Sequence, residues 1–135
     1  MIEYLMKFLP YMLQSTVVTI EIFVLTLVLA LPLGLPIALG SNSRIKPLAW
    51  LCRLFVLVVR GTPLMLQLFV VYFGPYYVSA SLAKLGWIKA PILLKNLGEN
   101  WLMVAVIIGF ALNYAAYFAE IFRSGIASMS QGQYE

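Results

Sequence analysis

Three apolar runs, each long enough to cross a lipid bilayer, constrain this chain more than any other feature. They cover residues 17–39, 54–76 and 101–122. As helices with about 1.5 Å of rise per residue, they would span roughly 33 to 35 Å, against a hydrocarbon core of about 30 Å. The sequence therefore predicts an all-α integral membrane protein with three transmembrane helices, in a single domain that covers residues 1–135.

Composition supports this class and excludes others. Hydrophobic residues make up 63% of the chain, charged residues only 10%, and the mean hydropathy is +0.95, far outside the range of soluble domains. The single Cys52 excludes an internal disulfide, and the absence of His removes the commonest metal ligand and acid–base group. With no phosphate-binding glycine loop and no nucleophile–base arrangement, we expect no enzyme activity, no metal, no cofactor and no nucleic-acid partner.

The first sixteen residues are expected to be retained, because they lack the basic leader and small-residue cleavage site of a signal peptide. Their apolar residues recur at helical spacing. Two interpretations fit this pattern, namely a short interfacial helix bent at Pro10 and a plain helical lead-in to the first span.

The distribution of basic residues gives an orientation. One side of the membrane would hold Arg44, Lys46, Arg53, Arg60 and Arg123, and the other Lys7, Lys84, Lys89 and Lys95. A bias of five to four favours the first group as cytoplasmic and places the amino terminus outside. Residues 78–100 are too polar to cross, so we expect them on the outer surface.

Prolines interrupt two of the predicted spans. The first span carries Pro32, Gly34 and Pro36, and because each proline removes a backbone donor, this pattern predicts either a kink or a local adjustment of packing. The second carries the motif Arg60-Gly61-Thr62-Pro63. Thr62 could cap a helix whose first residue is Pro63, so this motif predicts a bend or a complete break.

Two amides, Gln67 and Asn113, lie about 18 to 20 Å into their spans and therefore near the membrane midplane. A polar group at this depth either bonds to a neighbouring helix or faces a water-filled path. Because an amide can donate to a carboxylate and accept from an ammonium group, we name both as candidate contacts for a zwitterionic substrate.

The third predicted helix has two distinct faces. One is polar, and a stripe of small residues suited to close helix packing lies opposite. The polar face comprises Gly109, Asn113, Ala116, Tyr117 and Glu120, and the small stripe comprises Ala111, Ala115 and Ala119. Glu120 and Arg123, three residues apart, are predicted to form a salt bridge at the helix end.

Two stretches carry a family resemblance. Residues 60–77 read R-G-T-P-L-M-L-Q-L-F-V-V-Y-F-G-P-Y-Y, and residues 113–135 read N-Y-A-A-Y-F-A-E-I-F-R-S-G-I-A-S-M-S-Q-G-Q-Y-E. Together they resemble the permease subunit of polar amino-acid ATP-binding-cassette importers, of the histidine, glutamine and arginine type. The resemblance implies a five-helix type I permease in the cytoplasmic membrane, with its amino terminus outside.

The resemblance also implies a set of partners and a mechanism. Two ATPase subunits would hydrolyse ATP, a second permease subunit would complete the pore, and an extracytoplasmic solute-binding protein would deliver a small polar amino acid for transport by alternating access. Tyr117 joins the two amides as a candidate lining residue of the substrate pathway. Residues 123–135 would lead into the helix that docks on the ATPase, with Gly132, Gln133 and Glu135 as coupling candidates.

Measured against this family, the chain is expected to be truncated at the first residue of the coupling helix, Glu135. We therefore expect a fragment or a truncated product that does not support ATP-driven uptake by itself. Two alternatives stay open: a small membrane protein that scaffolds or regulates partners without transport, and a permease for a related solute such as an opine.

Overall fold

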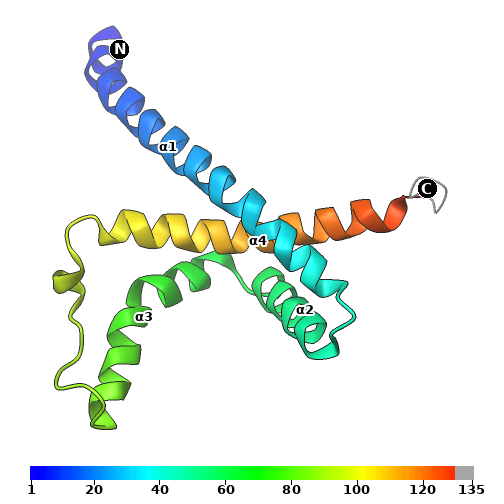
Figure 1. Ribbon diagram of the computed structural model, residues 1–135. Coiled ribbons are helices and arrows are strands. Elements are labelled where there is room, and N and C mark those ends of the chain that lie inside the picture. The colour runs from blue at the N-terminus through cyan, green and yellow to red at the C-terminus, as the bar shows by residue number, and fades with distance from the viewer. Residues whose placement is uncertain (130–135) are drawn as a thin grey trace.

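The computed structural model describes residues 1–129, which form four α-helices and one 3-10 turn (Figure 1). The elements are α1 (Ile2–Ser41), α2 (Lys46–Gly61), α3 (Leu64–Lys84), η1 (Leu94–Leu97) and α4 (Trp101–Ser128). No strand occurs among these residues. Three helices, α1, α3 and α4, are long and apolar enough to cross a membrane, which confirms the predicted fold class and number of spans.

The first helix is longer than predicted. Residues 2–16 belong to α1 and are continuous with the predicted span 17–39, and Pro10, Pro32 and Pro36 all lie inside the helix. The prediction of a separate interfacial helix is therefore wrong, and the helical lead-in is what the structure has. The reason is that a proline costs one backbone hydrogen bond and some bending strain, while apolar residues at helical spacing continue on both sides of Pro10.

The predicted span 54–76 is two helices. Helix α2 ends at Gly61, Thr62 and Pro63 are extended (φ −113°, ψ 146° and φ −65°, ψ 136°), and α3 begins at Leu64. A proline disfavours the helical region for the residue before it, and Thr62, unlike the residues before the prolines inside α1, adopts the extended alternative. The break was one of the two predicted outcomes, but Pro63 is the N-cap of α3 and not its first helical residue.

The capping role considered for Thr62 is also wrong. Its hydroxyl donates to the carbonyl oxygen of Val58 in α2, at 2.9 Å, and α3 has no side-chain cap. A threonine hydroxyl readily bonds to the carbonyl four residues earlier. The Thr62 hydroxyl therefore bonds back into α2 and does not cap the first turn of α3.

The connection between α3 and α4 is tied to α3 at two points. The hydroxyl of Ser79 accepts the backbone N–H of Ile92 at 2.8 Å, and the indole N–H of Trp101 donates to the Tyr72 carbonyl at 3.0 Å. Helix α3 runs to Lys84, so the first part of the stretch 78–100, predicted as a surface segment, is helical.

The core consists of small residues where α1 crosses α4. Ala111, Ala115 and Ala119 are at most 3% exposed, and a Cβ atom placed on Gly34 of α1 would lie 3.1 Å from the Ala115 carbonyl oxygen and 3.2 Å from the Ala119 nitrogen. The predicted packing stripe is therefore confirmed, and its partner is α1. Backbones approach this closely only where side chains are minimal.

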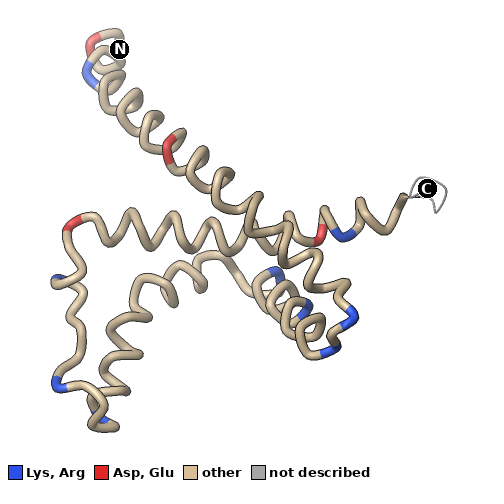
Figure 2. The backbone as a smooth tube through the Cα atoms, viewed as in Figure 1, with Lys and Arg blue, Asp and Glu red and all other residues tan. Residues whose placement is uncertain are grey.

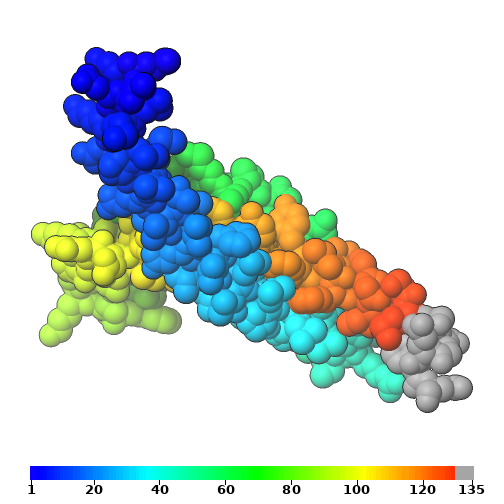
Figure 3. Space-filling model, turned by 90° about the horizontal axis from the view of Figure 1, so that it is seen from above, coloured from blue at the N-terminus to red at the C-terminus, as the bar shows by residue number. Residues whose placement is uncertain are grey.

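Large apolar side chains point outward instead. Phe23, Leu57 and Met65 are each more than 60% exposed, and the amino-terminal part of α1 stands clear of the remaining helices (Figure 3). An outward-facing apolar surface of this extent is stable in lipid and not in water. Figure 2 shows the charged residues mostly in separate places: around α2 and the last part of α4, at the amino terminus, and in the α3–α4 connection.

Candidate functional site

A side chain supplies hydrogen bonds to the carbonyl groups left free at the break between α2 and α3. Pro63 has no N–H to give to the Val59 carbonyl, the acceptor four residues earlier. The Nε2 atom of Gln67 lies 2.7 Å from that oxygen, 2.8 Å from the Thr62 hydroxyl and 3.1 Å from the Thr62 carbonyl oxygen. The amide of Gln67 therefore replaces the backbone donor that proline removes, which matters in hydrocarbon because water does not reach such groups.

The other end of the same amide reaches α4. The Oε1 atom of Gln67 accepts a hydrogen bond from Nδ2 of Asn113 at 2.9 Å, and Asn113 is only 6% exposed. The structure thus brings the two predicted midplane amides together, and the interhelical bond that we considered as an alternative is present. Their contact with a substrate stays a prediction.

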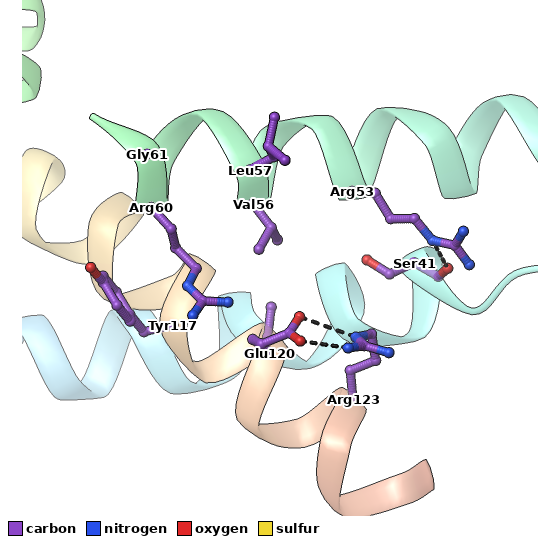
Figure 4. A pocket seen from close by; sticks show the side chains of 10 residues that line it. Ser41, Arg53, Val56, Leu57, Arg60, Gly61, Tyr117, Glu120 and Arg123 are labelled. Carbon is purple, nitrogen blue, oxygen red and sulfur yellow. Dashed lines mark hydrogen bonds and ion pairs between the residues drawn. The ribbon is translucent and has the colours of Figure 1, made fainter.

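An open cavity of about 710 Å³ lies between α2, α4 and the end of α1, with both charged and apolar lining residues (Figure 4). Its charged lining residues are Arg53, Arg60, Glu120 and Arg123. The Arg123 guanidinium binds Glu120 in a bidentate pair, with Nε to Oε2 at 3.1 Å and a terminal nitrogen on Oε1. The predicted salt bridge is confirmed, and it faces a cavity.

Arg60 lies over the ring of Tyr117 from α4, with its Cζ atom 5.4 Å from the ring centre. This distance is within the range of a cation–π contact. Figure 4 shows the guanidinium of Arg60 directed toward Glu120. The first residue of the R-G-T-P motif and the tyrosine of the second motif therefore meet across the cavity.

Arg53 was not among the predicted site residues. Its Nε donates to the Ser41 carbonyl oxygen at 3.0 Å, which satisfies a free acceptor at the end of α1. The signal was in the spacing, because Arg53 and Arg60 lie seven residues apart and therefore on one face of a helix, with Val56 between them. The predicted span began at residue 54, inside α2, so Arg53 and Arg60 were not recognised as residues of one helix face.

The predicted site residues thus fall into three sets. Arg60, Gly61, Tyr117, Glu120 and Arg123 line the cavity, and Thr62, Pro63, Gln67 and Asn113 form the bonded break. Gly132, Gln133 and Glu135 lie outside the described residues. Among residues 1–129, no group of three His, Cys, Asp or Glu side chains that could hold a metal ion is found.

These features define a class: an α-helical, multi-spanning membrane protein with a discontinuous helix and polar groups inside its bundle. The particular family follows from comparison of its sequence. Residues 30–135 match the family of binding-protein-dependent transport system inner membrane components, and the chain belongs to this family.

Individual relatives support the assignment. The arginine transport system permease protein ArtQ of Bacillus subtilis (strain 168) is 34% identical over 93% of this chain and 50% of its own length. The putative glutamine transport system permease protein GlnP of Rickettsia prowazekii (strain Madrid E) is 30% identical over 100% of this chain and 56% of its own length. The chain therefore spans about half the length of the curated relatives it matches.

A solved structure agrees with the fold. A crystal structure of an amino acid ABC transporter with histidines superposes with a TM-score of 0.72 at 30% identity, covering 96% of this chain and 52% of that one. The arrangement of α1 to α4 is thus shared with an amino acid ABC transporter.

Proposed function

We propose that this chain is part of the permease subunit of an ATP-binding-cassette importer that moves polar amino acids across the cytoplasmic membrane. The observation that carries the proposal is similarity along nearly the whole chain to permeases named for arginine and glutamine transport. The nopaline transport system permease protein NocM of Agrobacterium fabrum (strain C58 / ATCC 33970) is 31% identical over 99% of the chain. This relative favours an opine-type solute as the second candidate.

Transport would proceed by alternating access, with α2 and α3 as two pieces that move about Thr62 and Pro63. Two features support this role for the break. Its backbone groups are served by one side chain, Gln67, and discontinuous helices are a recurrent way to build transport sites. ATP would be hydrolysed by separate ATPase subunits, and a second permease subunit and an extracytoplasmic solute-binding protein would complete the importer.

Gln67, Asn113 and Tyr117 are the proposed pathway residues. In the described arrangement the two amides bond to each other, so a substrate carboxylate or ammonium group would have to replace that bond. Such an exchange would couple substrate binding to the α3–α4 contact. In an assembled importer, Asn113→Ala should raise the substrate concentration needed for half-maximal transport severalfold, and an unchanged value would remove Asn113 from the pathway.

Coupling to the ATPase is assigned to the segment 123–135, with Gly132, Gln133 and Glu135 as its proposed contacts. We also propose that the amino terminus is outside and the α1–α2 turn inside, as the basic residues of that turn favour. In this orientation, segment 123–135 is on the same side as the ATPase.

The decisive experiment measures uptake. The permease expressed from its whole gene is reconstituted in liposomes with its ATPase and solute-binding protein, and accumulation of radiolabelled arginine, glutamine and nopaline is followed with ATP and with a non-hydrolysable analogue. ATP-dependent accumulation of one of these solutes supports the proposal. If the assembled complex binds ATP but accumulates none of them, a different solute or a non-transporting scaffold role replaces it.

A further inference from the structure

The cavity between α2 and α4 carries more positive charge than its own residues neutralise. Three guanidinium groups, of Arg53, Arg60 and Arg123, line it with one carboxylate, Glu120. Both oxygen atoms of Glu120 accept a hydrogen bond from Arg123. The charges of Arg53 and Arg60 therefore lack a bonded carboxylate within the described part of the chain.

The hydrogen-bond donors of these two arginines are also largely unused. Arg53 bonds only through Nε, to the Ser41 carbonyl, and within residues 1–129 Arg60 contacts Tyr117 through its face and donates no hydrogen bond. A guanidinium presents five N–H donors in a planar fork that matches the oxygens of a phosphate. Two such forks on one wall of a cavity favour an anion with several acceptor oxygens.

The apolar surface of α2 beside the arginines indicates what kind of anion the cavity would bind. Next to its arginine face the helix exposes apolar side chains, with Trp50 65% exposed, Leu51 59% and Leu57 70%. An amphipathic helix with basic residues on one face and Trp and Leu on another is typical of the membrane–water boundary. The end of α1 at Ser41 lines the same cavity, which places it where a spanning helix ends.

We propose that this cavity binds the phosphate headgroup of an anionic phospholipid, through Arg53 and Arg60, with the acyl chains along the exposed apolar residues of α2. The apolar surface beside the arginines selects a lipid over a free phosphate ion. Basic pockets between membrane helices recognise such headgroups by the same chemistry. The inference requires only that the chain is embedded in a membrane, and it does not depend on which solute is transported.

The test uses the permease expressed from its whole gene, purified in detergent. Native mass spectrometry measures the dissociation constants of phosphatidylglycerol and of phosphatidylcholine with matched acyl chains. Wild-type protein should bind phosphatidylglycerol at least tenfold more tightly, and the double variant Arg53→Gln/Arg60→Gln should weaken that binding by about 30-fold. The control Arg44→Gln removes one charge from the α1–α2 turn, outside the cavity lining, as a match for the single variant Arg60→Gln, and should change the binding less than threefold.

Two further measurements distinguish lipid binding from misfolding of the variants and from a site for free phosphate. Arg60→Gln alone, which removes no hydrogen bond among the described residues, should weaken phosphatidylglycerol binding severalfold at an unchanged unfolding temperature. Inorganic phosphate at millimolar concentration should not displace the lipid. Equal affinity of the wild type for both lipids, equal loss in the Arg44→Gln control, or displacement of the lipid by inorganic phosphate would each overturn the proposal.

Discussion

At the scale of single residues, Gly34 sets the distance between α1 and α4. A Cβ atom there would lie 2.8 Å from Cβ of Phe118 and 3.1 Å from the Ala115 carbonyl oxygen, and these atoms move only if α4 moves. Gly34→Ala should therefore destabilise the permease by about 1–3 kcal/mol, measured as the shift of its thermal unfolding midpoint in detergent.

Gly74 is the matched control for this substitution. It lies inside α3, and a Cβ atom there would meet nothing within 4 Å. Gly74→Ala should be neutral or stabilise the helix by up to about 1 kcal/mol, since alanine is the better helix former. Equal losses at both positions would show that the close approach of α1 and α4 does not limit stability.

Removing two buried hydroxyls, one at Thr26 and one at Ser79, should have different effects on the free energy of unfolding. Thr26 is 5% exposed and its hydroxyl has no partner among the described residues, whereas the Ser79 hydroxyl donates to the Tyr76 carbonyl and accepts the N–H of Ile92. Thr26→Val should be neutral or stabilising, and Ser79→Ala should cost about 1–3 kcal/mol because it leaves a buried donor unpaired. Thermal unfolding of both variants checks this, and a large loss for Thr26→Val would mean that the assembled permease supplies a partner.

At the scale of elements, most of the helical pattern could be predicted. Apolar periodicity and length identify α1 and α4. The small-residue stripe of α4 predicts close packing because small side chains let two helix backbones approach each other. The boundary between α2 and α3 could not be settled, since the motif Arg60-Gly61-Thr62-Pro63 is compatible with both a bend and a complete break. The extended backbone of Thr62 before Pro63 makes the break, and the Gln67 side chain stabilises it by bonding to the Val59 and Thr62 carbonyls at the end of α2. A side chain that replaces a backbone donor in this way is not visible in hydropathy or in helical periodicity.

The same amide predicts a measurable coupling between α3 and α4. Gln67 and Asn113 share one hydrogen bond, so the variants Gln67→Leu, Asn113→Leu and the double variant form a thermodynamic cycle of unfolding free energies. We expect a coupling of about 0.6–1.7 kcal/mol, the range for hydrogen bonds between membrane helices. Gln67→Leu should cost more than Asn113→Leu, because it also leaves the Val59 and Thr62 carbonyls unpaired. Additive single effects would contradict the bond.

At the scale of the whole molecule, the number of spans followed from length and hydropathy, but the cavity did not. The R-G-T-P motif and the A-E-I-F-R motif lie far apart in the sequence, and only the return of α4 beside α2 places Arg60 over Tyr117 and next to Glu120. Arg53 joins them because α2 begins at Lys46. A tertiary contact of this kind depends on how α2 packs against α4, which neither segment encodes alone.

Orientation is the property of the whole molecule on which the proposed coupling to an ATPase depends, and charge alone decides it narrowly. Two exposed positions report it: Asn42 beside the α1–α2 turn and Lys89 in the α3–α4 connection. In a Cys52→Ser background, a membrane-impermeant maleimide should label Lys89→Cys on intact cells and Asn42→Cys only after permeabilisation. Because the chain crosses between these two positions once, through α3, their labelling must be opposite. Labelling of Asn42→Cys on intact cells would invert the topology and place Arg123 on the side without ATP, which would exclude the proposed coupling.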